Sequence, residues 1–303
     1  MSSLRQTVVP VHARLDVQHL SAFYELMVPS LEILRQNSGI SSGYQLLFVH
    51  GSCSEAAIWR PMLGWFAQRG IAGAAVSLRG HGGSGGSLEG AMINDYVDDV
   101  LSACSTLPDC PIVLVGHSMG GFVVQHLLGR TKRPELDSVI LMAPGPSRTM
   151  RTEGLRMALR RPLNFARATV SRDIRHIYDG DGLREFLLHP AIPAGTEASV
   201  RSAIGPESWT ALQEMNGLAP GWKANRRSTR MLVLSGCLDR MVRPKAARAT
   251  ARDWGADFRE IAGLSHMLPV EPGWPRVAEE MLVWLSAIHR EVRADATLMA
   301  SRR

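Results

Sequence analysis

The chain contains 303 residues, of which 45% are hydrophobic and 20% charged, and its formal net charge is +6. This composition is that of an ordinary globular protein, and the length suits one large domain with an insertion. The sequence shows no run of eighteen apolar residues, no apolar signal segment and no C-x-x-C pattern among its four cysteines. We therefore expect a cytoplasmic protein with reduced thiols and without a membrane span or signal peptide.

Strand-like and helix-like segments alternate from residue 44 onward. Short apolar runs predict strands over residues 44–50, 72–77, 111–115, 138–143, 230–235 and 257–261. Longer periodic segments predict helices over residues 56–69, 92–106, 119–129, 243–253 and 275–289. This alternation predicts an α/β fold with a mostly parallel central sheet and helices on both faces. Outside it, residues 8–17 favour a strand, residues 20–34 favour a helix, and residues 291–303 are expected to form a frayed tail.

A long segment separates the expected strands at 138–143 and 230–235. It is too long for a plain connection in such a sheet, and prolines divide it into short helical stretches. These stretches cover residues 155–159, 174–178, 183–188 and 208–215. We interpret residues 147–225 as a helical cap inserted into a core made of residues 1–146 and 226–303. Residues 1–43 are an atypical N-terminal extension of that core.

The excess positive charge lies in one part of the expected cap. Eight arginines occur between residues 147 and 177, namely Arg148, Arg151, Arg156, Arg160, Arg161, Arg167, Arg172 and Arg175. Only Glu153 and Asp173 oppose them there. Two interpretations stay open: attraction of substrates that carry a carboxylate or phosphate, or a solvated arginine-rich surface. No nucleic-acid motif accompanies the arginines and the ten histidines lack metal-ligand spacing, so we expect no nucleic-acid partner, metal or other cofactor.

A glycine-flanked serine is the most informative position in the chain. Gly116, Ser118 and Gly120 form a G-x-S-x-G pattern after the apolar run 111–115 and before the apolar stretch 121–128. Strand, tight turn and helix are the setting of a nucleophile elbow, in which the serine projects from the tip of a sheet. The two glycines allow the tight turn because they carry no Cβ.

An acid and a histidine follow in the order that such a serine requires. Asp239 comes just after the buried run 231–236, and His266 lies in the loop after the short strand 258–261. A histidine can take the proton of a serine hydroxyl, and a buried carboxylate can orient the histidine ring. Asp239 alone could cap a turn, and His266 alone could be a satisfied loop residue. Together with Ser118 they predict a catalytic triad.

Several segments together resemble the α/β-hydrolase superfamily, from about residue 43 to about residue 285. The resemblance is carried by residues 49–52, 78–84 and 116–121 and by the loops that contain Asp239 and His266. It implies the α/β-hydrolase fold with a helical cap after the sixth strand. It also implies an oxyanion hole formed by the backbone N–H groups of Ser52 and Met119. Ser77 departs from the family pattern, which often has Asp there, in a segment that we interpret as a structural loop.

Residues near these motifs and within the cap are candidates for a substrate pocket. They are His50, Cys53, His117, Met150, Met157, Leu187, Trp209, Met215, Trp222 and Met267. Methionine and tryptophan would suit a bulky apolar or aromatic acyl or alcohol group. The alternative for the cap residues is ordinary packing within the cap, and for Cys53 it is the role of a small filler.

The sequence thus predicts a serine hydrolase that cleaves a carboxylic ester, lactone or thioester through an acyl-enzyme on Ser118. We expect a small-molecule ester or thioester substrate as its partner, and attraction of an anionic substrate stays open as one interpretation of the arginines. Two alternatives use the same triad, namely a C–C bond hydrolase and an acyltransferase. An alternative of another class is a non-catalytic ligand receptor or scaffold that retains the fold. Epoxide hydrolases and dehalogenases are disfavoured because similar enzymes of those classes carry Asp at the nucleophile position.

Overall fold

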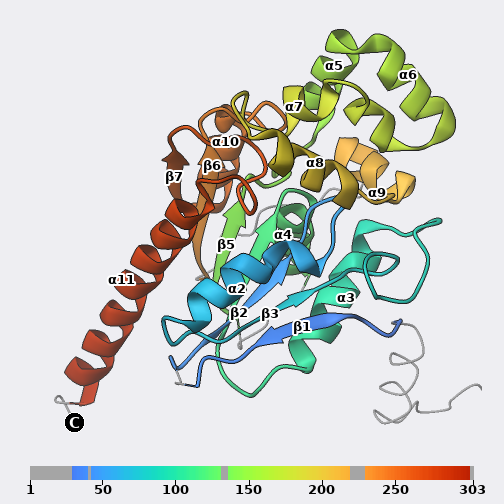
Figure 1. Cartoon of the computed structure of the whole chain (residues 1–303). Helices are drawn as coiled ribbons and strands as arrows, with labels where there is room; N and C mark the ends of the chain where they lie inside the picture. Colours follow the sequence, from blue (N-terminus) through green and yellow to red (C-terminus); the bar gives the residue numbers. More distant parts are fainter. Residues whose placement is uncertain (1–28, 40–41, 131–135, 219–228, 301–303) are drawn as a thin grey trace, which may run out of the picture.

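A seven-stranded sheet organises the described part of the chain (Figure 1). The computed structural model describes residues 29–39, 42–130, 136–218 and 229–300, with side chains to residue 290. The strands are β1 (Ile33–Gln36), β2 (Gln45–Val49), β3 (Gly73–Val76), β4 (Ile112–His117), β5 (Leu136–Met142), β6 (Arg230–Gly236) and β7 (Asp257–Ile261). Their order is β1-β3-β2-β4-β5-β6-β7, and only the β1–β3 pair is antiparallel. The predicted α/β fold with a mostly parallel sheet is confirmed.

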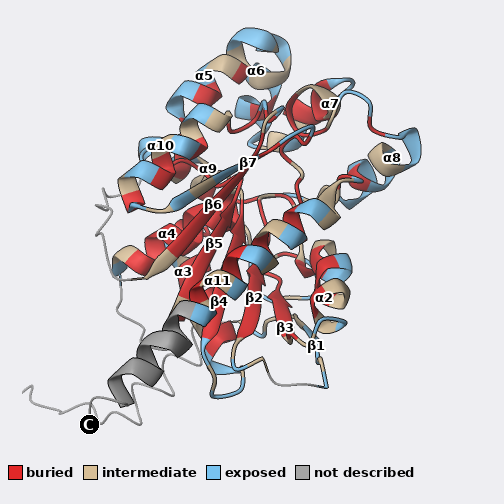
Figure 2. Ribbon diagram, turned by 90° about the vertical axis from the view of Figure 1, so that its left-hand side faces the viewer, coloured by how far each residue is buried: buried red, intermediate tan, exposed pale blue. Residues whose placement is uncertain are grey.

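Helices cover both faces of this sheet. They are α2 (Arg60–Ala67), α3 (Ile93–Ser105), α4 (Met119–Arg130), α10 (Pro244–Trp254) and α11 (Trp274–Ala300), with a 3₁₀ turn η1 (Ala56–Trp59) before α2. One apolar core packs α3, α4 and α10 against the sheet, and a second packs α2 and α11 against its other face. Strands β2, β3 and β4 are buried at every residue, as expected for parallel strands covered on both faces (Figure 2).

Two expectations about the ends of the fold are wrong. Ile33 and Leu34 lie in strand β1 and not in a helix, because they pair antiparallel with Val76 and Ala75 at the sheet edge. Helix α11 runs to Ala300 and does not end near residue 289 in a frayed tail. No glycine or proline interrupts the sequence after residue 275, so the helix lacks a local stop signal. The strand expected over residues 8–17 lies outside the described residues.

The segment between β5 and β6 is helical where the structure describes it. It contains α5 (Arg151–Arg160), α6 (Pro162–Ser171), α7 (Gly182–Phe186), α8 (Ala194–Ala203) and α9 (Trp209–Gln213), with single turns η2 (Ile174–Tyr178) and η3 (Glu214–Leu218). We call residues 143–229 the β5–β6 segment. Its helices gather beyond the end of the sheet to which β5 points (Figure 1). The division into core and cap stays a prediction. No helix among the described residues is long and apolar enough to cross a membrane.

The turn from β4 into α4 packs directly against the end of β2. A Cβ atom on Gly120 would lie 2.4 Å from the carbonyl oxygen of His50 and 2.5 Å from that of Val49. Both neighbours belong to the backbone of the central sheet, so neither can move aside easily. Glycine is therefore required at position 120 for the turn to approach β2 this closely.

We expect the Gly120→Ala substitution to lower the free energy of unfolding by about 2–3 kcal/mol, because the added methyl group overpacks against fixed backbone. Gly64→Ala is the matched control. A Cβ on Gly64 in α2 meets no atom within 4 Å, so this change should stabilise the protein by about 0.5–1 kcal/mol. Urea unfolding of both variants measures these changes. Equal stabilities for the two variants would contradict the proposed packing constraint.

Candidate active site

Ser118 stands at the turn between β4 and α4 in a left-handed backbone conformation. Its φ is 50°, which is uncommon for a residue other than glycine. The Ser118 N–H donates to the Met142 carbonyl (3.0 Å), and the Ser118 carbonyl accepts from the N–H groups of Phe122 (3.1 Å) and Gly145 (2.8 Å). Neighbouring backbone thus holds the turn, and the Ser118 side chain faces a cavity.

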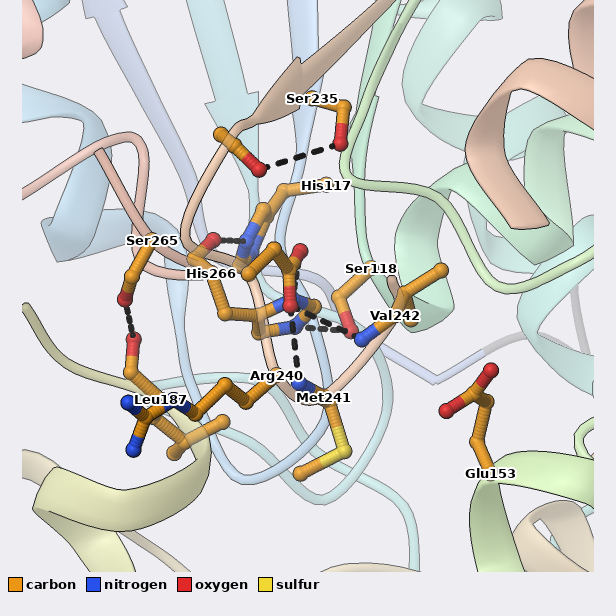
Figure 3. A network of polar contacts seen from close by, with 12 residues as sticks. His117, Ser118, Glu153, Leu187, Ser235, Arg240, Met241, Val242, Ser265 and His266 are labelled. Carbon is orange, nitrogen blue, oxygen red and sulfur yellow. Dashed lines mark hydrogen bonds and ion pairs between the residues drawn. The ribbon is translucent and has the colours of Figure 1, made fainter. Parts of the chain in front are cut away.

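His266 links Ser118 to Asp239 by two short hydrogen bonds. Its Nε2 lies 2.9 Å from Ser118 Oγ, and its Nδ1 lies 2.8 Å from Asp239 Oδ2 (Figure 3). The other carboxylate oxygen accepts from the backbone N–H groups of Met241 (2.8 Å) and Val242 (2.9 Å). Because the ionised carboxylate can only accept, Nδ1 carries the proton and Nε2 can accept from the Ser118 hydroxyl. The structure therefore brings together the three residues that the sequence predicts as a triad.

The His266 loop is held from two sides by buried side chains. His117 Nε2 donates to the His266 carbonyl (2.9 Å), and burial lowers the pKa of His117 to about 3, so its ring is neutral. On the other side, Glu271 accepts from the Ser265 N–H (2.9 Å) and the His189 N–H (3.1 Å). Glu271 was not predicted from the sequence, although an acid shortly after a loop histidine is a visible signal.

The two predicted oxyanion donors flank Ser118. Ser52 lines the same cavity as Ser118, and a Cβ on the preceding Gly51 would lie only 3.0 Å from Ser118 Cβ. Met119 is the first residue of α4, so its N–H has no partner within the helix. Among the described residues, neither N–H donates to a protein acceptor. An oxyanion donor must not be taken up by a protein acceptor, so both positions stay predicted donors.

A cavity of about 950 Å³ opens beside Ser118 and His266. Eight predicted pocket residues line it: Cys53, His117, Met150, Met157, Leu187, Trp209, Met215 and Met267. Several further apolar residues that were not predicted also line the cavity, including Phe165, Tyr178, Ile204 and Val242. Phe165 and Tyr178 lie in helical stretches, and Ile204 and Val242 lie in loops. Which side chains of such segments face inward depends on how the segments pack. Burial raises the pKa of the Cys53 thiol, which keeps it protonated and supports the filler interpretation.

His50 does not line this cavity, and that prediction is wrong. Its side chain is fully buried, with Nδ1 donating to the Gly51 carbonyl (2.7 Å) and Nε2 accepting from the Leu78 N–H (3.0 Å). Both ring nitrogens are therefore used in holding the loop. Trp222, another predicted pocket residue, lies outside the described residues. No group of three or more His, Cys, Asp or Glu side chains in the described ranges is arranged to hold a metal.

Most arginines of the basic segment form ion pairs outside the cavity. Six of the eight lie within 4 Å of a carboxylate: Arg148, Arg156, Arg160, Arg161, Arg167 and Arg175. Their partners include Asp253 and Glu185, which lie far away in the sequence. No arginine or lysine appears among the described residues that line the cavity. The interpretation as a solvated arginine-rich surface accounts for this arrangement, and we do not propose an anionic substrate.

A family model places the chain among known proteins. The model of the alpha/beta hydrolase family matches residues 46–280. The chain therefore belongs to the alpha/beta hydrolase family, as its resemblance implied. Among solved structures, an esterase from Exiguobacterium antarcticum superposes with a TM-score of 0.70 at 14% identity, covering 85% of this chain and 96% of that one. Identity this low shows a shared fold alone.

Curated relatives match shorter stretches. A 2-(acetamidomethylene)succinate hydrolase from Mesorhizobium japonicum is 39% identical over 79 residues, which is 26% of this chain and 28% of that protein. A non-heme chloroperoxidase from Kitasatospora aureofaciens is 30% identical over 104 residues, covering 34% of this chain and 38% of that protein. The matched region thus spans less than half the length of either relative.

A second buried polar cluster contacts the backbone of Cys53 through Glu207. His81 Nε2 lies 3.2 Å from Glu207 Oε2, and His81 Nδ1 lies 3.0 Å from the Arg79 carbonyl. Because both neighbours are acceptors, both ring nitrogens act as donors and the ring is an imidazolium. Burial alone lowers the pKa of His81, but the hydrogen bond and charge of Glu207 outweigh burial and raise it.

We expect the His81→Gln substitution to cost more stability near pH 6 than near pH 9. The folded-state pKa of His81 is raised, so its charge stabilises the fold fully below the unfolded value of about 6.5 and is lost as pH rises through the folded pKa. Urea unfolding of both proteins across this range measures the difference. His176→Gln, at a solvent-screened ion pair, is the control. A penalty for His81→Gln that stays constant with pH would contradict the charged pair.

Proposed function

We propose that this protein is a serine hydrolase of carboxylic esters, lactones or thioesters, with Ser118 as nucleophile. The observation that carries the proposal is the continuous hydrogen-bond chain from Ser118 through His266 to Asp239 at the wall of a largely apolar cavity. The N–H groups of Ser52 and Met119 flank the same serine. Nucleophile, base, orienting acid and oxyanion donors are the parts that acyl transfer to serine requires.

In this proposal the reaction proceeds through two tetrahedral intermediates. Ser118 Oγ attacks the carbonyl carbon while His266 Nε2 takes the hydroxyl proton, and Asp239 stabilises the resulting imidazolium. The Ser52 and Met119 N–H groups bind the oxyanion. His266 then returns the proton to the leaving alkoxide or thiolate, which departs and leaves an ester on Ser118. Water, deprotonated by His266, attacks this ester and releases the acid and free Ser118.

The cavity favours a neutral substrate with a bulky apolar acyl or alcohol group. Its size is at the upper end of ordinary small-ligand sites. Met157 of α5, Phe165 of α6 and Trp209 of α9 supply apolar and aromatic surface, and Met267 lies next to His266. Burying such a group would exclude water from the reacting carbonyl and strengthen the hydrogen bonds to the oxyanion.

Turnover of p-nitrophenyl esters of graded acyl length by wild-type protein and Ser118→Ala tests the proposal. We expect wild-type turnover well beyond one equivalent and a fall in kcat of at least about 10⁴-fold in Ser118→Ala, because nothing replaces the nucleophile. Ser202→Ala, at an exposed serine of α8, should match wild type. Circular dichroism establishes that all three proteins are folded.

Two outcomes would overturn the proposal. Retention of more than about a tenth of the wild-type rate in Ser118→Ala would mean that another residue is the nucleophile. Absence of turnover by folded wild-type protein across esters, lactones and thioesters would favour a ligand receptor. Product analysis in the presence of an added alcohol distinguishes hydrolysis from acyl transfer.

A further inference from the structure

We propose that Glu207 is a positioning residue that fixes the oxyanion segment at Ser52 and Cys53 from within the β5–β6 segment. The inference rests on the proposed function, because it concerns the Ser52 N–H as an oxyanion donor. Glu207 lies in the loop before α9 and does not touch the cavity beside Ser118. It acts on the site only through the backbone of Cys53.

The chain around Glu207 holds the Cys53 backbone from both sides. Glu207 Oε2 accepts from the Cys53 N–H (3.1 Å), and the Gly205 N–H donates to the Cys53 carbonyl (2.9 Å). These bonds join positions about 150 residues apart in the sequence. Together they fix both peptide groups that flank the Cys53 Cα atom. One of them, the Ser52–Cys53 peptide group, is the neighbour of the peptide group that carries the Ser52 N–H.

Cys53 needs this support because its backbone is strained. Its φ is 60°, in the left-handed region that residues other than glycine rarely adopt. Cys53 is buried, so loss of the N–H acceptor would leave an unsatisfied donor at a cost in free energy. Without the Glu207 carboxylate, the Cys53 backbone would lower its free energy by rotating to a commonly populated conformation. That rotation would also turn the preceding peptide and misdirect the Ser52 N–H.

The Glu207 carboxylate is itself rigidly held. Its side chain is fully buried, and Oε1 accepts from the Tyr96 hydroxyl and the Ser208 N–H, both at 2.7 Å. His81 adds a charged donor to Oε2 at 3.2 Å. Tyr96 belongs to α3, and His81 lies in the loop after β3, so the core of the protein fixes the carboxylate. A carboxylate that accepts from four donors cannot move easily, so it is a fixed acceptor for the Cys53 N–H.

This arrangement couples the substrate pocket to the oxyanion segment. Ile204 and Trp209 lie on either side of the 205–207 stretch in the sequence, and both line the cavity. A substrate group that packs against them therefore contacts the residues on both sides of the stretch that holds Cys53. The β5–β6 segment therefore contributes both to substrate binding and to the geometry of transition-state stabilisation.

The substitution Glu207→Gln tests the role of the carboxylate. The amide keeps the size of the side chain but replaces one acceptor oxygen with a donor, so it cannot serve all four donors. We expect kcat to fall by about 10–100-fold, with KM within about 3-fold, because an oxyanion donor acts mainly in the transition state. Rates are expressed per active site, counted by complete titration with a fluorophosphonate.

Glu214→Gln is the matched control. Glu214 also belongs to the β5–β6 segment and also binds core backbone, since its carboxylate accepts from the Ile93 N–H at 2.7 Å. That contact lies at the start of α3 and involves neither Cys53 nor Ser52. We expect Glu214→Gln to keep kcat within about 3-fold of wild type. An equal fall in kcat for Glu214→Gln and Glu207→Gln would mean that weakening any contact between this segment and the core lowers the rate. That outcome would contradict a specific role for Glu207.

Inhibition by an alkyl boronic acid separates positioning from a merely structural role. Ser118 Oγ adds to the boron, and a boronate hydroxyl occupies the oxyanion position. We expect Glu207→Gln to raise the Ki of the boronic acid by about the same factor as kcat falls, while the Ki of the product alcohol changes little. A residue that only stabilised the fold would lower the number of titrated sites and leave both inhibition constants unchanged.

Tyr96→Phe keeps the proposal testable if Glu207→Gln does not fold. It removes one donor to Glu207 and leaves the carboxylate in place, so we expect a smaller fall in kcat of about 3–10-fold with a matching rise in the boronic acid Ki. If both variants keep the wild-type kcat and the wild-type Ki of the boronic acid while Ser118→Ala is inactive, the proposed role of Glu207 is wrong and the proposed function still stands. Activity of Ser118→Ala would instead overturn the proposed function.

Discussion

The close contact between the β4–α4 turn and the end of β2 fixes the position of Ser118 relative to the segment that follows β2. Gly120 leaves no room for a side chain against the carbonyl groups of Val49 and His50. A Cβ on Gly51 would in turn lie 3.0 Å from Ser118 Cβ. Because the backbone itself sets these distances, the serine and the oxyanion segment are side by side before any substrate arrives. Such preorganisation is what electrostatic stabilisation of an oxyanion requires.

Buried histidines around this contact have different charge states, and their partners explain the differences. Burial lowers the pKa values of His50 and His117 to about 3, so both stay neutral and serve as hydrogen-bonding supports for nearby loops. His81 faces a carboxylate and a carbonyl, and its pKa is raised. The positive charge therefore stays beside Glu207, one layer behind the oxyanion segment. His266 remains the ring that bonds to Ser118.

Local patterns predicted much of the fold and of the candidate site, and long-range contacts explain the rest. Buried parallel strands appear as apolar runs, and Ser118 and Asp239 each follow such a run. His266 follows the short, largely exposed strand β7, and the parallel topology gathers all three residues at one sheet edge. Strand β1 was missed because Ile33–Gln36 is half exposed and owes its conformation to pairing with β3. Glu207 gave no signal, since its partners come from three distant segments. The arginine-rich stretch was ambiguous because several of its acidic partners, such as Asp253 and Glu185, lie outside the stretch in the sequence.

Direct observation of the acyl-enzyme tests whether Ser118 is the nucleophile. Wild-type protein mixed with p-nitrophenyl hexanoate, quenched in acid within milliseconds and digested, should yield a Ser118 peptide heavier by one hexanoyl group. The adduct should appear before steady-state release of hexanoic acid and be absent from Ser118→Ala. Turnover of the ester without an adduct, or with the hexanoyl group on another residue, would contradict Ser118 as the nucleophile.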